Sequence, residues 1–139
     1  MRDEILSKLE MLKGYVELLK GYQSRTLDQV KADPTLRGAI ERYLAVALEC
    51  TLDVGEMIIS LEGLRKPGAY REVIEVLGEK NIISEDFVKR FTPAAGFRNI
   101  LVHMYAEVDV EKVYKFLQES LGDFDEFAKC VANYLKKSR

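Results

Sequence analysis

Apolar residues recur at alternating spacings of three and four along most of the chain, and this periodicity restricts the fold more than any other feature. The first stretch shows it most clearly, with apolar residues at Ile5, Leu9, Leu12, Val16 and Leu19. Such spacing places the side chains on one face of an α-helix. No segment alternates polar and apolar residues in the way that is typical of a half-buried strand. The sequence therefore predicts an all-α fold.

Local start signals divide the first half of the chain into helices. The first helix is expected to run to about residue 22. Thr26 and Gln29 then fit a capping box, which predicts a short helical turn. Asp33 is a suitable N-cap, and Pro34 suits the first position of a long, largely buried helix within residues 32–64. Small residues inside this helix, at 38 and 55, are expected to let another helix approach closely.

The second half begins with a break at "RKPGAY", residues 65–70. A short helix is expected over residues 71–81, with a turn at Asn81. Ser84 is the next N-cap, and Thr92–Pro93 is expected to kink or interrupt that helix before it continues to residue 105. Asp109 then caps a final helix in which Gly122 allows a bend. These segments predict an up-and-down bundle of about five principal helices, antiparallel where the loops are short.

Composition fits one folded domain over residues 1–139. The chain is 47% apolar and 32% charged, with only three prolines. Lys plus Arg number 21 and Asp plus Glu 23, so the net charge of −2 provides no broad positive surface for a long duplex. The small positive clusters at Lys89/Arg90 and at the final "LKKSR" are typical of solvated surface. Any contact with a nucleic acid is therefore expected to be local.

Several classes of protein are disfavoured by what the sequence lacks. Cys50 and Cys130 have no CxxC spacing, and the charged start "MRDEILSKLE" does not match a signal peptide. No apolar run approaches the roughly 20 residues that span a bilayer. We therefore expect a cytoplasmic protein with reduced thiols and no membrane association. With one histidine and scattered carboxylates, neither a metal site nor a cofactor is expected.

The stretch "GFRNILVHMY", residues 96–105, contains the only histidine and carries an unusual set of polar groups for so apolar a segment. On a helical wheel of about 100° per residue, one arc of about 100° is apolar and is expected to face the core. It contains Phe97, Ile100, Leu101 and Met104. The opposite flank contains Tyr105, Arg98, Val102, Asn99 and His103. The polar groups are thus expected to share one exposed flank.

These groups suit metal-independent cleavage of RNA. His103 is a candidate general base or acid, and Arg98 offers a planar set of donors for a phosphate. Asn99 could orient the imidazole or hold a phosphate oxygen. Arg98 and His103 lie about 140° apart around the axis, so one helix is not expected to close both on a small group. A second copy facing the first across a twofold axis could do so. The alternative is a polar dimer interface or a surface patch of ion pairs, and the residues alone leave both open.

The motif resembles the HEPN superfamily, and more closely its HepT-like branch, in which the pattern is Arg-x4-His-x-Tyr. Here the matching residues are Arg98, Asn99, His103 and Tyr105, within "AGFRNILVHMYAEVD". Three other segments are similar to that branch: "LRGAIERYLAVALECTLDVGEMI", "YREVIEVLGEKNIIS" and "VYKFLQESLGDFDEFAK". The resemblance covers nearly the whole chain.

The resemblance implies a homodimeric, HEPN-like helical toxin of a type VII HepT-MntA-like toxin-antitoxin system. It implies endoribonuclease activity in which Arg98 and His103 are catalytic and Asn99 assists. The antitoxin would be a small MntA-type nucleotidyltransferase that transfers adenylyl groups from ATP to Tyr105, where added charge and bulk would occlude the phosphate site. The alternative is a non-enzymatic dimeric helical module that binds a nucleotide or the nucleotidyltransferase.

Overall fold

The computed structural model describes residues 1–103 and 108–137. Within these ranges the chain is all-α and forms no strand, as the periodicity predicts. The helices are α1 (Arg2–Lys20), α2 (Leu27–Ala32), α3 (Pro34–Glu62), α4 (Tyr70–Glu79), α5 (Glu85–His103), α6 (Val110–Glu119) and α7 (Leu121–Lys137). The described part therefore contains seven helices, where about five principal ones are expected. The short α2 and the division of the last helix account for the difference.

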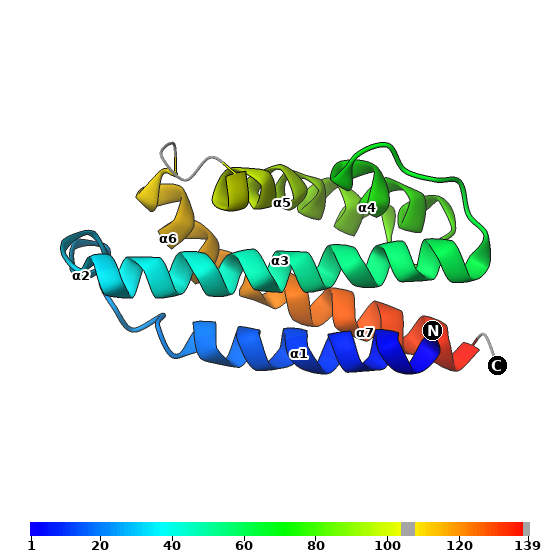
Figure 1. The fold of residues 1–139 in the computed structure, drawn as a ribbon, viewed down its shortest axis with the longest axis horizontal. Helices are drawn as coiled ribbons and strands as arrows, with labels where there is room; N and C mark the ends of the chain where they lie inside the picture. Colours follow the sequence, from blue (N-terminus) through cyan, green and yellow to red (C-terminus); the bar gives the residue numbers. More distant parts are fainter. Residues whose placement is uncertain (104–107, 138–139) are drawn as a thin grey trace.

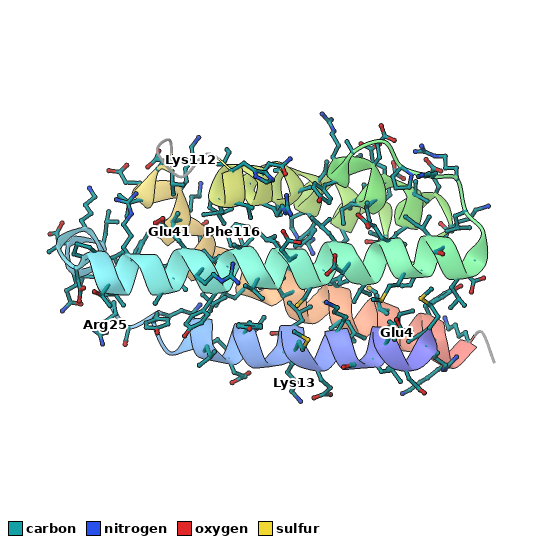
Figure 2. The ribbon with its side chains drawn as sticks, in the orientation of Figure 1. Glu4, Lys13, Arg25, Glu41, Lys112 and Phe116 are labelled. Atoms are coloured by element: carbon teal, nitrogen blue, oxygen red, sulfur yellow. The ribbon has the colours of Figure 1, made fainter. Side chains whose placement is uncertain are left out.

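The long helix α3 lies at the centre of the molecule and contacts each of the other helices. Figure 1 shows α1 and α7 on one side of α3 and α4 and α5 on the other. The short helices α2 and α6 contact each other at one end of the bundle. Helices α1 and α5 both run antiparallel to α3 (Figure 1). Charged side chains of α1, such as Glu4 and Lys13, lie on its exposed side (Figure 2).

Three N-caps hold the helix starts where local sequence predicts them. The Thr26 hydroxyl accepts from the Gln29 backbone N–H at 3.1 Å, and the Gln29 side chain accepts from the Thr26 N–H at 2.9 Å. Asp33 accepts from the backbone of the first turn of α3, which has Pro34 at its start. Asp109 caps α6 by accepting from the Glu111 N–H at 2.9 Å. The capping box and both aspartate caps are confirmed.

Two helix boundaries differ from expectation. Helix α5 continues through Pro93 without interruption, because Pro93 and Lys89 are both exposed and water can reach the Lys89 carbonyl that loses its N–H donor. The expected final helix is divided at Ser120, whose N–H donates to the Phe116 carbonyl at 2.9 Å. The bend therefore falls before Gly122, which lies inside α7. The turn at Asn81 is confirmed by its φ of 58°.

Aromatic side chains form much of the core between α5 and α7. Phe91 stacks on Phe87 and Phe127, with centroid distances of 5.2 and 6.4 Å, and meets the edge of Phe124 at 6.0 Å. All four rings are buried. Aromatic pairs in these geometries stabilise a core beyond the area that they bury. They fix the face that α5 turns toward the bundle.

Close packing of α4 on α3 depends on Gly55. A Cβ atom at this position would lie 2.5 Å from Val73 Cγ1, so the expected close approach is confirmed here. At Gly38 it is wrong, because a Cβ there would meet no atom within 4 Å. Among the helices described, none combines the length and the apolar character needed to cross a membrane.

Candidate active site

The candidate motif lies in the last turns of α5, and a cap fixes the start of this helix. At its start the Ser84 hydroxyl accepts from the Phe87 N–H at 3.1 Å, as expected for a cap. Arg98, Asn99 and His103 follow ten or more residues later, and His103 ends the helix. Tyr105, the expected site of modification, lies outside the described residues.

Arg98 faces the bundle, which corrects the expectation that it lies on an exposed flank. It is 7% exposed. The buried positions of α5 are Phe87, Phe91, Ala94, Ala95 and Arg98. They recur at spacings of three and four, so Arg98 continues the line that begins at Phe87. The expectation is wrong because a wheel limited to residues 97–105 omits the four apolar residues that set this face.

The two other motif residues that the structure describes are accessible. Asn99 and His103 are exposed, and so is Val102 between them. Phe97, which was expected in the core, is half-buried at the side of the helix and packs against Phe116 of α6 at a centroid distance of 5.3 Å. The buried arginine therefore has exposed neighbours on its own helix.

The guanidinium of Arg98 has a different partner on each side. Its Nη2 donates a charge-assisted hydrogen bond to Glu49 Oε1 of α3. Its Nη1 donates to Asn99 Oδ1 at 3.0 Å and lies 3.4 Å from His103 Nε2. Its central carbon lies 4.4 Å from the centre of the Tyr70 ring, a cation–π distance. The structure thus brings Arg98, Asn99 and His103 together within one chain.

This convergence bears on a second expectation, that one helix does not close Arg98 and His103 on a small group: the two side chains meet within one helix, and closure on a small group stays a prediction. Their Cα positions do differ by about 140° around the axis. The arginine side chain is long enough to run along the helix and cross that angle, so Nη1 reaches the imidazole. Whether two copies face each other is a separate matter and stays a prediction.

Two carboxylates of α3, Glu49 and Glu56, interact with the arginine, and sequence reasoning missed them. Glu49, Asp53 and Glu56 recur at spacings of four and three. Asp53 pairs with Lys8 of α1 at 3.3 Å. Burial raises the pKa of Glu56, the charges of Asp53 and Glu49 raise it further, and Arg98 lowers it. Arg98 therefore interacts with Glu49 and Glu56, whereas Asp53 pairs with α1 instead.

Two functional candidates, Glu49 and Tyr70, are absent from the expected set. One signal for Glu49 is present in the sequence: it interrupts an otherwise apolar stretch, between Leu48 and Cys50 of a buried helix. A carboxylate in such a place generally has a cationic partner. The sequence does not show which cation it is, because Arg98 is 49 residues away.

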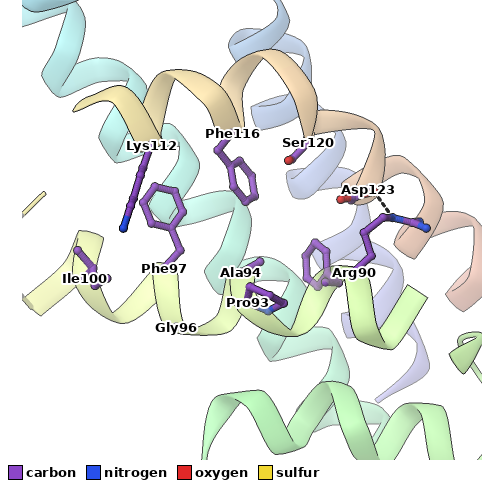
Figure 3. A pocket seen from close by; sticks show the side chains of 11 residues that line it. Arg90, Pro93, Ala94, Gly96, Phe97, Ile100, Lys112, Phe116, Ser120 and Asp123 are labelled. Atoms are coloured by element: carbon purple, nitrogen blue, oxygen red, sulfur yellow. Dashed lines mark hydrogen bonds and ion pairs between the residues drawn. The ribbon is translucent and has the colours of Figure 1, made fainter. Parts of the chain in front are cut away.

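A hollow of about 490 Å³ lies beside the motif, between α5, α6 and the start of α7. Figure 3 shows Phe97 and Phe116 next to each other in it, with Lys112 at one end and the Arg90–Asp123 ion pair at the other. Arg98 and His103 do not line it. Its lining is mostly apolar, so it does not provide the phosphate site.

Comparison with known proteins identifies the family. Residues 12–131 match the ribonuclease HepT-like family. The chain belongs to this family. A putative RNase of Archaeoglobus fulgidus is 30% identical over 136 residues, covering 98% of this chain and 96% of that protein. The tRNA nuclease HepT of Aphanizomenon flos-aquae is 25% identical over 131 residues, covering 94% of this chain and 89% of that protein.

A solved HepT-like structure has the same fold. It is the tri-AMPylated Shewanella oneidensis HEPN toxin in complex with the MNT antitoxin, with 26% identity and a TM-score of 0.86. The alignment covers 96% of this chain and 99% of that one. The bundle is therefore HEPN-like, and the family that the motif suggests is confirmed.

Proposed function

We propose that this HepT-like protein is a metal-independent endoribonuclease, the toxin of a type VII HepT-MntA-like toxin-antitoxin system that acts on RNA in the cytoplasm. The observation that carries the proposal is the 3.4 Å approach of Arg98 Nη1 to His103 Nε2, beside the exposed Asn99. This short distance supports the proposal that the imidazole accepts a proton and the guanidinium binds phosphate at one phosphodiester. The tRNA nuclease relative supports the same reaction class.

In the proposed reaction, His103 Nε2 takes the proton from a ribose 2′-OH. The 2′ oxygen attacks the adjacent phosphorus, and the bond from phosphorus to the 5′ oxygen breaks. The departing 5′ oxygen takes up a proton, which leaves a 2′,3′-cyclic phosphate and a 5′-hydroxyl. Arg98 Nη1 donates to the phosphate oxygens as they gain charge. In the proposed homodimer, the imidazolium of a second copy would supply the proton to the leaving oxygen.

Neutralisation is proposed to act on Tyr105 through an MntA-type nucleotidyltransferase. Tyr105 follows His103 by two positions in the sequence. An adenylyl group carries a negative phosphate, so it would compete for Arg98 and also obstruct RNA. The tri-AMPylated state of the Shewanella toxin supports this proposal. Co-expression with an MntA-type nucleotidyltransferase should add adenylate masses that Tyr105→Phe removes.

The central test is ribonuclease activity of purified His103→Ala with a chelator present. His103 is exposed, so its truncation should leave the fold intact. Loss of general base catalysis should lower the cleavage rate by about 10²–10⁴-fold. Lys89→Ala is the matched control, because Lys89 is also exposed on α5.

Full activity of His103→Ala would contradict the assigned role of the imidazole. A wild-type protein that cleaves none of a broad set of RNAs, while still binding the nucleotidyltransferase, would instead identify a non-enzymatic binding module. The cleavage assay, run on the wild-type protein and on both variants, therefore separates the two functions.

A further inference from the structure

We propose that Glu49 is a positioning residue for the nuclease: it holds one edge of the Arg98 guanidinium so that the other edge is presented beside His103. This inference rests on the proposed function and assigns a role to a residue outside the motif. Glu49 belongs to α3, whereas all motif residues belong to α5 or follow it. The central helix would then take part in the chemistry.

The partners of the guanidinium carry the argument. Nη2 is occupied by Glu49, and Nη1 faces Asn99 and His103. The third nitrogen, Nε, is buried and has no hydrogen-bond partner within the described residues. The Nη1 edge is therefore the part of the cation that adjoins the exposed Asn99 and His103, and in the proposed reaction a phosphate oxygen would replace Asn99 Oδ1 as its acceptor.

Burial explains why the guanidinium needs an anchor. Arg98 is 7% exposed, and its neighbours on the buried face of α5 are alanines and phenylalanines. A cation on such a face loses hydration, and a side chain as long as arginine can swing its charged end to water. Glu49 opposes this movement with a charge-assisted hydrogen bond. The ring of Tyr70 adds a cation–π contact to the same guanidinium.

Location on α3 makes Glu49 a suitable anchor. This helix is the longest of those described and contacts all the others, so its backbone is firmly held. Catalytic groups depend on such support, because a displacement of about 1 Å can reduce the rate by about 10²-fold. The length of the Glu49 side chain would therefore set how far Nη1 extends toward His103.

Two substitutions separate positioning from charge. Glu49→Gln keeps the length of the side chain and an oxygen that accepts from Nη2, but removes the charge. Glu49→Asp keeps the charge but shortens the side chain by one methylene, which draws Arg98 back. If Glu49 acts by position, Glu49→Asp should lower kcat by about 10–100-fold with KM within about twofold of wild type. Glu49→Gln should retain more of kcat than Glu49→Asp does.

A purely structural role predicts the reverse order. Charge neutralisation of a buried cation would then be the important term, so Glu49→Asp would resemble wild type and Glu49→Gln would lose stability and activity together. Asp53→Asn is the matched control, since Asp53 lies one turn further along α3 and pairs with Lys8 instead. It should leave kcat unchanged. Activity of Glu49→Asp equal to wild type would overturn the proposal.

A second readout does not depend on nuclease activity. Arginine-labelled protein should show distinct Nη1 and Nη2 resonances for Arg98 by NMR, because each end of the guanidinium has its own partner. These resonances should merge or shift in Glu49→Asp and stay separate in Asp53→Asn. If they are unchanged in Glu49→Asp, Glu49 does not hold Arg98. If they respond while wild-type protein cleaves no RNA, the anchor is upheld and the proposed function fails.

Discussion

The contact between α3 and α4 provides a sharp test of how this fold is held together. The two helices can approach closely because Gly55 has no Cβ atom. In Gly55→Ala the new methyl would lie 2.5 Å from Val73 Cγ1 and 3.3 Å from Leu77 Cδ1. Val73 is 1% exposed and β-branched, so it has little freedom to move aside. Overpacking of this kind costs about 1–3 kcal/mol. The constraint on Val73 places the cost near the upper end of that range.

Helix propensity acts in the opposite direction. Alanine is better than glycine inside a helix by about 1 kcal/mol, which leaves a net destabilisation of about 1–2 kcal/mol for Gly55→Ala. For a chain of this length that lowers Tm by about 3–7 °C. Thermal unfolding followed by circular dichroism measures it directly.

Gly14→Ala isolates the propensity term. Gly14 lies in the exposed interior of α1, where a new Cβ would meet nothing within 4 Å. This variant should gain about 1 kcal/mol. Combining Gly55→Ala with Val73→Ala removes the clashing methyl and should recover much of the lost stability. A Gly55→Ala protein that melts at or above the wild-type temperature would refute the argument that the two helices are in limiting contact there.

Three further perturbations test charges within the bundle. Glu56→Gln removes a carboxyl whose pKa is raised by burial and by neighbouring carboxylates. Because ionising this carboxyl lowers the stability of the folded wild-type protein as pH rises, the variant should be more stable than wild type at neutral pH. The difference should disappear in acid, where the wild-type carboxyl is protonated. Burial and a hydrogen bond with Glu62 raise the pKa of Tyr134 to about 12. The stability of the wild-type protein, measured by chemical denaturation, should therefore fall as pH rises from 10 to 12. Tyr134→Phe should not show this fall. Arg98→Met with Glu49→Met should be as stable as wild type or more stable by up to about 2 kcal/mol, yet inactive, while Arg98→Met alone should be less stable than the double variant.

Helix starts could be predicted from the sequence because capping is a local interaction. The Thr26 capping box and the Asp33 cap each join groups at most three residues apart, so the sequence contains both partners. The division at Ser120 could not be predicted in this way. Apolar residues continue at spacings of three and four from Val113 to Phe124, and this pattern is typical of one continuous helix. A contact distant in sequence lies at the break, where the Gln23 side chain donates to the Leu117 carbonyl at 2.9 Å.

The motif could be found from the sequence, but its orientation could not be read from ten residues. The apolar face of α5 is set by Phe87, Phe91 and the two alanines, which precede the motif. Extending the wheel back to Phe87 places Arg98 on the buried side. A helical wheel cannot predict that Arg98 pairs with Glu49, because the pairing depends on how α3 and α5 pack.

The buried position of Arg98 itself argues for function. A core face of phenylalanine and alanine is not improved by a guanidinium, because removing two charges from water offsets most or all of their attraction. Matched apolar side chains at 49 and 98 would satisfy the same packing. What the ion pair adds is a cation whose Nη1 edge is fixed beside an exposed imidazole. A site that must stabilise developing phosphate charge benefits from such a preorganised donor, since it need not reorganise during the reaction. The arrangement therefore makes sense as a catalytic device held by the central helix, and poorly as a means of stabilising the bundle.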